Sequence, residues 1–248
     1  MHGRNLVVAL GVPVAALICL TSSCAPSIQT GSPTTTTRTS GGTAPPPATS
    51  TPTRPPPPTT VDYRRLEREV LTELNTVRAN PSAYATYLSE LVPLFNGKLI
   101  KKPGMTVTIR TNEGATAVRE AINALQRQAP VPPLTLSSGM STAAAELATD
   151  QQRTGNLGHS GSDGSSPGSR LNKYGTWQQS YSENVDYGPF LSGRDVIVDL
   201  LVDDGVPDRG HRRNIFDGSA RVAGIACGPH PQLRSMCVID QASGYVDR

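Results

Sequence analysis

Apolar residues recur every three to four positions in several stretches of the chain, and this spacing predicts amphipathic helices. The first stretch has an apolar face formed by Leu66, Val70, Leu74 and Val77. Its helix is expected to end near Asn80, because Pro81 cannot continue a helix but suits the first turn of the next one. Ser137 or Ser138 can cap a later helix that Gly155 ends. The helices after the first are predicted over residues 81–92, 114–128, 137–154 and 192–203.

Short apolar runs between turn residues predict the strands of a small sheet. The runs cover residues 182–187, 220–228 and 235–242, and a further short strand is expected over 105–109 within the irregular stretch 98–112. Helices precede and separate these strands, so they are expected to cover the sheet on both sides. The pattern therefore predicts an α+β fold, an α-β-α sandwich with a small antiparallel sheet flanked by helices.

The N-terminus has the pattern of an export signal. Arg4 is followed by an apolar run of 15 residues, Leu6 to Leu20, which is short of the roughly 20 residues that a membrane-spanning helix needs. The run ends in LTSSCAPS, which resembles a bacterial lipobox although Thr21 stands where Leu or Val is usual. We expect residues 1–23 to be a lipoprotein signal peptide, with Cys24 as the lipidated first mature residue that attaches the chain to the membrane. Ordinary cleavage nearby, which would give a freely secreted protein, is the alternative.

Residues 25–60 have the composition of a linker. Pro, Thr and Ser account for 10, 12 and 4 of these 36 residues, so almost no apolar side chain is available to bury. Such a segment cannot offset the entropy lost on ordering, and we expect a disordered tether. Residues 61–248 are then the folded domain, long enough for one sizeable core.

The charge distribution argues against nucleic-acid binding. All 20 Asp and Glu residues lie after residue 60, whereas three of the 23 Lys and Arg residues lie before it. The domain thus carries 20 charges of each sign, and the net charge of +3 comes from the leader and tether. A neutral domain lacks the basic excess that phosphate binding requires.

Two cysteines fall within the domain, on apolar runs that flank the turn-like sequence GPHPQLRSM. They are Cys227 and Cys237. In an exported protein, cysteines on neighbouring strands are expected to form a disulfide. The alternatives are two reduced thiols, or a metal pair completed by His230, for which the spacing is wide.

Candidate chemistry centres on two histidines in Gly-His sequences. The chain has only four histidines, and His159 and His211 each follow a glycine in a polar turn, where functional side chains tend to lie. Glu183 lies between them in the sequence SENV. An acid in this position can orient an imidazole and fix its tautomer, and it can accept N–H groups from the backbone of the His159 loop; the two roles are compatible.

Short motifs stand in a definite order along the domain: LNTVRANPSAYA (74–85), PLTLS (133–137), Gly158-His159-Ser160, Glu183-Asn184, Gly210-His211-Arg212, VAGIA (222–226) and CVID (237–240). This order resembles the CAP superfamily (cysteine-rich secretory, antigen 5 and pathogenesis-related proteins, also called SCP-like) in its bacterial form, over about residues 65–245. The resemblance implies an α-β-α sandwich in which two histidines and two acids face one cleft. His159, Glu183 and His211 occupy three of these four positions.

The fourth position departs from the animal members of the family, which carry a Glu on the helix before the second histidine. No Glu lies between Glu183 and His211. Asp203 or Asp204, at the end of the helix predicted over 192–203, is therefore the candidate.

Acids at the C-terminal end of a helix meet the unfavourable pole of its dipole. A bound cation or ion pairing is expected to compensate Asp203 and Asp204, with three candidate partners: Arg209, Arg212 and Arg213. Asp195 and Asp199, earlier on the same helix, are expected to lie on a solvated face.

The function that these residues favour is ligand binding at the cell envelope. Two neutral imidazoles near carboxylates suit a divalent metal such as Zn²⁺, held by His159 and His211. A small cell-wall or lipid ligand in the same cleft is equally consistent with the set. The residues expected to line the cleft are His159, Glu183, His211, Asp203 and Asp204.

Two other functions remain as alternatives. One is an extracellular hydrolase of the peptidase kind that uses His159 or His211 with Glu183 as a general base. Ser160 is not its expected nucleophile, because neighbouring residues in a turn usually point apart. The other is a structural or adhesion module of the envelope. We favour binding over catalysis.

Overall fold

The computed structural model describes residues 61–248, and the expected signal peptide, Cys24 and the tether lie outside the described residues. The helices are α1 (Tyr63–Ala79), α2 (Pro81–Leu91), α3 (Ala115–Arg127), α4 (Ser138–Thr154), α5 (Pro167–Tyr174), α6 (Gly193–Val202), α7 (Gly210–Ile215) and the short 3-10 helix η1 (Val92–Leu94). The strands are β1 (Phe95–Asn96), β2 (Leu99–Ile100), β3 (Ile109–Arg110), β4 (Thr135–Leu136), β5 (Gly175–Gly188), β6 (Val222–His230) and β7 (Arg234–Asp247). Among these helices, none is long and apolar enough to cross a bilayer.

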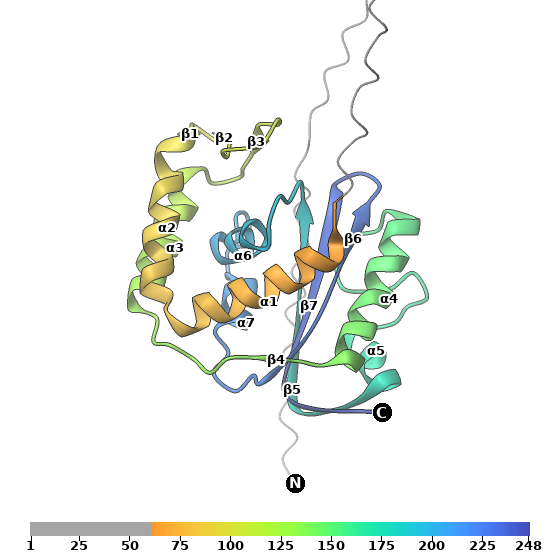
Figure 1. Ribbon diagram of the computed structural model, residues 1–248. Coiled ribbons are helices and arrows are strands. Elements are labelled where there is room, and N and C mark those ends of the chain that lie inside the picture. The colour runs from red at the N-terminus through yellow and green to blue at the C-terminus, as the bar shows by residue number, and fades with distance from the viewer. Residues whose placement is uncertain (1–60) are drawn as a thin grey trace, which may run out of the picture. The chain divides into compact units, whose positions relative to one another are not determined.

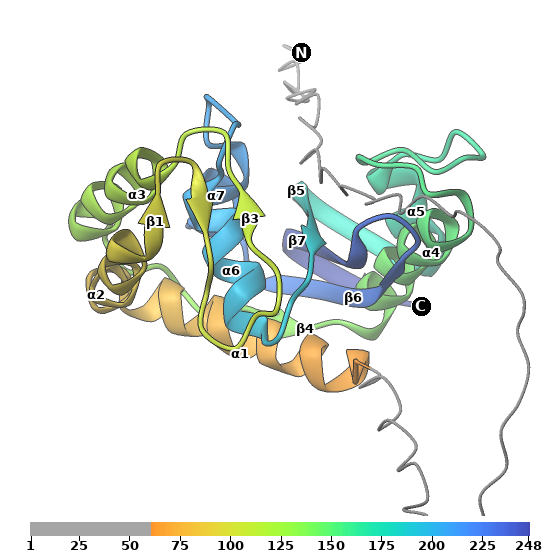
Figure 2. The ribbon, with the colours of Figure 1, turned by 90° about the horizontal axis from the view of Figure 1, so that it is seen from above.

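The main sheet has the strand order β4-β6-β7-β5, with β6 and β7 joined as a hairpin (Figure 1). Helices α4 and α5 lie on one side of it, and α1, α2, α3, α6 and α7 lie on the other (Figure 2). This confirms the predicted α+β sandwich. The sheet is mixed, because the two-residue strand β4 runs parallel to β6 while the other pairs are antiparallel. A separate three-stranded sheet contains β1, β2 and β3.

Alternation along the strands divides the core between the two faces of the sheet. On β7, Met236 and Val238 pack with α4, whereas Cys237 and Ile239 belong to the larger core under α1 and α6. Helix α4 comes so close to β6 that a Cβ atom at Gly224 would overlap the backbone of Met140 in α4. Only glycine fits at this crossing.

Side-chain caps explain why the predicted helices begin where they do. Asp62 accepts the N–H of Arg65 at the start of α1, and Asn80 caps α2 with Pro81 in its first turn. Ser137, rather than Ser138, caps α4, and Gly155 ends this helix in a left-handed conformation. Ser192 caps α6 in a capping box. The helices predicted over these ranges are confirmed.

The strand predicted over 105–109 is wrong. Only Ile109 of this range belongs to a strand, β3, and Met105 is buried in an irregular segment.

The expectation for two acids of α6 is also wrong. Asp195 and Asp199 do not lie on a solvated face, because Lys102, only 8% exposed, places its Nζ 3.7 Å and 2.7 Å from their carboxylates.

Cys227 and Cys237 lie directly opposite each other on β6 and β7 and form a disulfide, as predicted. His230 does not join them in a metal pair. Its Nδ1 accepts the N–H groups of Gln232 and Leu233 within the hairpin turn.

Arg78, near the end of α1, joins three parts of the domain. It is 0% exposed. Its guanidinium donates to the carbonyl oxygens of Pro132, Ile215, Asp217 and Ala220 at 2.5 to 3.2 Å. Burial lowers the pKa of Arg78 to about 10, which leaves the side chain charged at neutral pH. The segment after α7 is thereby fixed to α1.

We expect Arg78→Met to lower the free energy of unfolding by about 3–5 kcal/mol, because it leaves several buried carbonyls without a donor. Arg68→Met, at an exposed position of the same helix, is the matched control and should change stability by no more than about 0.5 kcal/mol. Urea denaturation at pH 7 measures both. An Arg78→Met loss no larger than that of the control would contradict this role.

Candidate functional site

The first histidine pairs with an acid on the edge strand of the sheet. His159 lies in the loop after α4, and its Nδ1 is 2.8 Å from Oε1 of Glu183 on β5. The Glu183 side chain is buried, whereas that of His159 is 35% exposed. We call His159 and Glu183 the first pair. It fixes one ring nitrogen against a buried carboxylate and leaves the imidazole side chain partly exposed.

Arg170 on α5 holds this pair in place. Its Nη2 donates to the second oxygen of Glu183 at 2.6 Å. Its Nη1 donates to the carbonyl oxygens of His159 and Ser165, both at 3.1 Å. Glu183 is therefore oriented by an imidazole and a guanidinium, and the interpretation in which it accepts backbone N–H groups of the loop does not match the structure.

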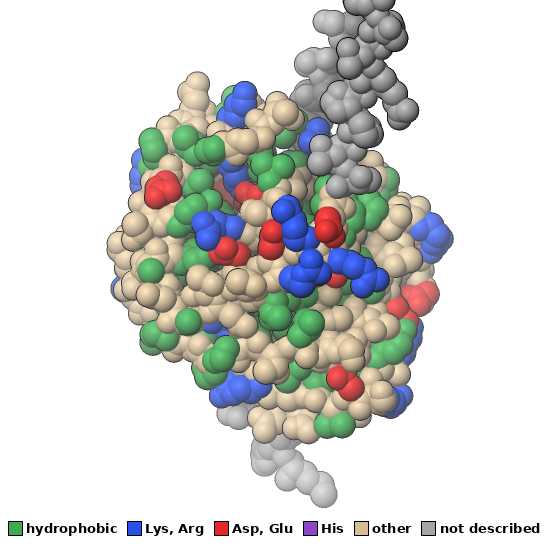
Figure 3. Space-filling view, in the orientation of Figure 1, with side chains coloured by type: hydrophobic (Ala, Val, Ile, Leu, Met, Phe, Trp, Pro, Cys, Tyr) green, Lys and Arg blue, Asp and Glu red, His purple; other side chains and the backbone are tan. Residues whose placement is uncertain are grey.

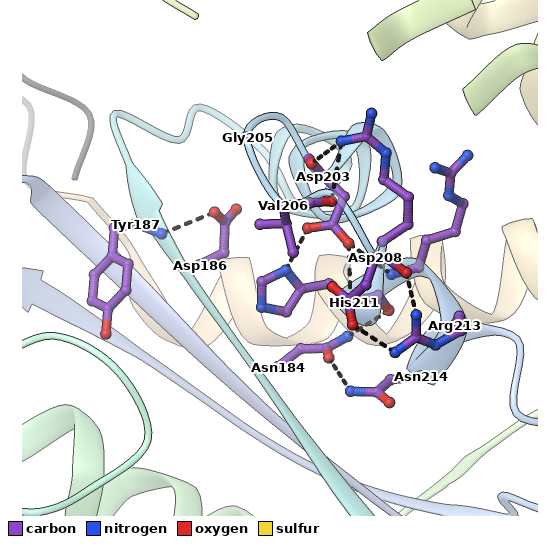
Figure 4. A network of polar contacts seen from close by, with 12 residues as sticks. Asn184, Asp186, Tyr187, Asp203, Gly205, Val206, Asp208, His211, Arg213 and Asn214 are labelled. Carbon is purple, nitrogen blue, oxygen red and sulfur yellow. Dashed lines mark hydrogen bonds and ion pairs between the residues drawn. The ribbon is translucent and has the colours of Figure 1, made fainter. Parts of the chain in front are cut away.

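The second pair is formed by His211 at the start of α7 and Asp203 at the end of α6 (Figure 4). Nδ1 of His211 is 2.6 Å from Oδ1 of Asp203. Oδ2 of Asp203 accepts the backbone N–H of His211 at 2.9 Å and that of Arg212 at 3.4 Å. Asp203 has a left-handed backbone with φ 55°, which turns the chain from α6 towards α7. The His211 side chain is 25% exposed.

The arginines expected to pair with Asp203 and Asp204 form ion pairs with other acids. Arg209 binds Glu113 at 2.7 Å, Arg212 binds Glu120, and Arg213 binds Asp208 at 2.8 Å. The carboxylate of Asp203 is stabilised instead by the N-terminal N–H groups of α7, which favour a negative charge. Arg209 donates to the Asp203 carbonyl oxygen at 2.7 Å, and its positive charge also interacts with the Asp203 carboxylate.

Asp204 forms no hydrogen bond with either histidine. Its carboxylate accepts the backbone N–H groups of Asn112 and Glu113, at 2.6 Å and 2.8 Å. It thereby fixes the segment that leads into α3. Of the two candidate acids, the structure brings only Asp203 to a histidine.

Asn184 connects the second pair to the sheet. Its Nδ2 donates to the carbonyl oxygen of His211 at 3.1 Å, and its Oδ1 accepts from Asn214 at 2.7 Å. Because neighbouring residues of a strand point to opposite faces, Glu183 serves the first pair from one face of β5 and Asn184 serves the second pair from the other.

Asp186 is a further acid near the second pair that sequence reasoning missed (Figure 4). One of its oxygens, Oδ2, is buried and has no partner among residues 61–248. Burial raises the pKa of Asp186 well above its usual range, and the negative charge of Asp199 raises it further.

The donor set does not fit a zinc ion with three protein ligands. Across residues 61–248, no three side chains of His, Cys, Asp and Glu come close enough to hold one ion. The Nδ1 atoms of His159 and His211 are both bound to carboxylates, and neither Nε2 atom has a partner within the described domain. Nor does any hydroxyl or thiol in this part of the chain bond to either ring, so Ser160 forms no nucleophile–base pair with His159.

The sequence matches the family model CAP, described as the cysteine-rich secretory protein family, over residues 119–241. The chain contains a CAP domain. The match includes all four residues of the two pairs. No curated protein matches the chain.

Two solved structures are similar to this CAP domain protein. An outer surface protein from Borrelia burgdorferi aligns with a TM-score of 0.38 and 16% identity, over 45% of this chain and 78% of that one. An extracellular protein containing a SCP domain, from Bacillus anthracis str. Ames, aligns with a TM-score of 0.36 and 14% identity. That alignment covers 52% of this chain and 37% of the Bacillus protein.

We expect Glu183→Gln to destabilise the CAP domain by about 3–5 kcal/mol, because an amide N–H would face either Arg170 or His159 and leave a buried charge unpaired. Glu90→Gln, at an exposed position, is the control and should stay within about 0.5 kcal/mol of the parent. Urea denaturation at pH 7 gives both values. Equal stability of the two variants would show that the first pair is not held as described.

Proposed function

We propose that this CAP domain is an extracellular binding module, and that the Nε2 atoms of His159 and His211 accept hydrogen bonds from a small polar ligand of the cell envelope. One observation carries the proposal. In both pairs, Nδ1 is fixed by a buried carboxylate while Nε2 has no partner in the described domain and the ring is partly exposed. With Nδ1–H donated to the acid, Nε2 carries the lone pair.

We infer that the two rings contact one ligand at separate points. Glu183 fixes the ring of His159, Asp203 fixes the ring of His211, and Asn184 holds the backbone carbonyl of His211. No third His, Cys, Asp or Glu side chain joins the two rings in a metal-sized cluster among residues 61–248. In this proposal the ligand is larger than an ion and presents a donor to each ring. Hydroxyl and amide groups, which abound in cell-wall glycan–peptides, have this chemistry.

An extracellular location is supported by chemistry of the chain itself. The Cys227–Cys237 disulfide is of a kind that persists in oxidising compartments. The export signal and the lipidation of Cys24, which we propose as the membrane attachment, agree with it. On the face that carries α1, basic and acidic side chains alternate (Figure 3), with pairs such as Arg65–Glu69 and Arg194–Glu73. That face has no unbroken basic stripe for a nucleic acid.

The proposal predicts that soluble glycan–peptide fragments of a bacterial cell wall shift the Nε2 signals of His159 and His211 in nitrogen-15 NMR spectra of the protein. His159→Gln/His211→Gln should weaken this binding about tenfold or more, since two hydrogen bonds of roughly 1 kcal/mol each are lost. Buried His230, whose ring already has backbone partners, is the internal reference and should not shift.

Three results would overturn the proposal in different directions. Fragment binding that the double variant leaves unchanged would place the ligand elsewhere. Stoichiometric uptake of Zn²⁺ that the double variant abolishes, measured by calorimetry, would show that the ligand is a metal. Cleavage of the fragments that depends on either histidine would show that the domain is a hydrolase.

A further inference from the structure

A second carboxyl group lies beside the first pair, on the central strand of the sheet. Asp240 on β7 is directly opposite Glu183 on β5, and its neighbour on β6 is Gly224. Directly opposed residues of antiparallel strands point to the same face. Both carboxyl groups therefore project towards α4 and α5. Asp240 is only 1% exposed.

The charged groups around Asp240 do not balance it. Arg170 comes from α5 and Glu183 from β5, with His159 beyond Glu183, while β6 offers Gly224 and α4 contributes apolar residues. One guanidinium thus faces two carboxyl groups. The two terminal nitrogens of Arg170 already bind Glu183 and two loop carbonyls. Oδ1 of Asp240 has no partner among residues 61–248.

We propose that Asp240 remains protonated at neutral pH and donates its hydrogen to Glu183, so that it positions Glu183 against Nδ1 of His159. Two carboxyl groups with one buried cation are stable when a proton supplies the second positive charge. Burial raises the pKa of Asp240 well above its usual range, and the negative charge of Glu183 acts in the same direction.

The protonated acid completes the support of the first pair. Glu183 then accepts from His159, Arg170 and Asp240, three donors that come from a loop, a helix and the neighbouring strand. With both oxygens of Glu183 held, the side chain cannot turn away from the imidazole. This role deepens the proposed function, since it keeps Nε2 of His159 facing outward, and it is tested without any ligand.

The test compares Asp240→Asn with the unmodified protein by urea denaturation between pH 4 and pH 8. An acid whose pKa is raised by folding stabilises the fold below its unfolded value of about 4 and loses that contribution as the pH rises. The amide of Asn keeps a donor but cannot ionise. Asp240→Asn should therefore match the parent at pH 4 and be more stable than it at pH 8, while exposed Glu90→Gln shows no such divergence.

The opposite sign would overturn the proposal. If Asp240→Asn becomes less stable than the parent as the pH rises, then Asp240 is ionised and pairs with Arg170. Should the variant fail to fold, carbon-13 NMR of the side-chain carboxyl groups in the unmodified protein decides. A midpoint for Asp240 well above 4 supports the proposal, and an ordinary midpoint overturns it.

Further variants distinguish an effect on the position of Glu183 from an effect on the stability of the whole domain. Asp240→Val removes the donor, and we expect nitrogen-15 NMR to show that His159 loses its single Nδ1–H form, which Asp240→Asn restores. Asp186→Asn removes a buried acid from the other side of β5 and should leave the His159 ring unchanged. If Asp240→Val also leaves the ring unchanged, Asp240 does not position Glu183. None of these measurements requires that the domain bind a glycan–peptide.

Discussion

The alternation of side chains along β5 is the constraint on which the site depends. This strand pairs with β7 through nearly all of its length, so the directions of Glu183 and Asn184 are set by the backbone ladder and cannot be adjusted one at a time. Glu183 must point towards α4 and α5, and Asn184 towards α6 and α7. The two histidine segments therefore reach β5 from opposite sides, which explains why the domain forms two separate pairs.

Two buried arginines, Arg78 and Arg170, bind backbone carbonyl groups of the segments that carry the histidines. The loop around His159 and the segment after α7 are irregular, so their carbonyl groups lack partners from regular secondary structure. Arg170 binds the carbonyls of His159 and Ser165 in the His159 loop. Arg78 binds the carbonyl of the last residue of α7 and two carbonyls in the segment that follows it. A guanidinium has five donors in one plane, which lets one side chain hold several loop atoms.

The sequence was sufficient for those elements whose signals are local. Asp62, Asn80 and Ser137 cap helices with the expected apolar spacing, and the cysteines lie on adjacent strands. Helices α5 and α7 and the first half of β5 were not predicted. Helix α7 has only six residues and no apolar period, and its N–H groups are capped by Asp203 from the preceding helix.

The site was predictable only in part for the same reason. His159, His211 and Glu183 stand in recognisable motifs, but the choice between Asp203 and Asp204 depends on which of them takes the left-handed conformation at the end of α6. Arg170 and Asp240 are brought to Glu183 by a helix packed on the sheet and by the register of β5 and β7. Neither contact has a signal in the local sequence.

The two faces of the sheet show why Asp240 differs from Asp195 and Asp199. On the α6 side, the ammonium group of Lys102 reaches the carboxylates of Asp195 and Asp199 directly. On the α4 side, Arg170 binds Glu183 and the loop through its two terminal nitrogens, its Nε has no partner, and no other cation faces Asp240 within the described domain. A buried carboxyl needs either a cation or a proton. Because Arg170 is the one cation that faces both Glu183 and Asp240 among residues 61–248, a proton supplies the second positive charge in our proposal.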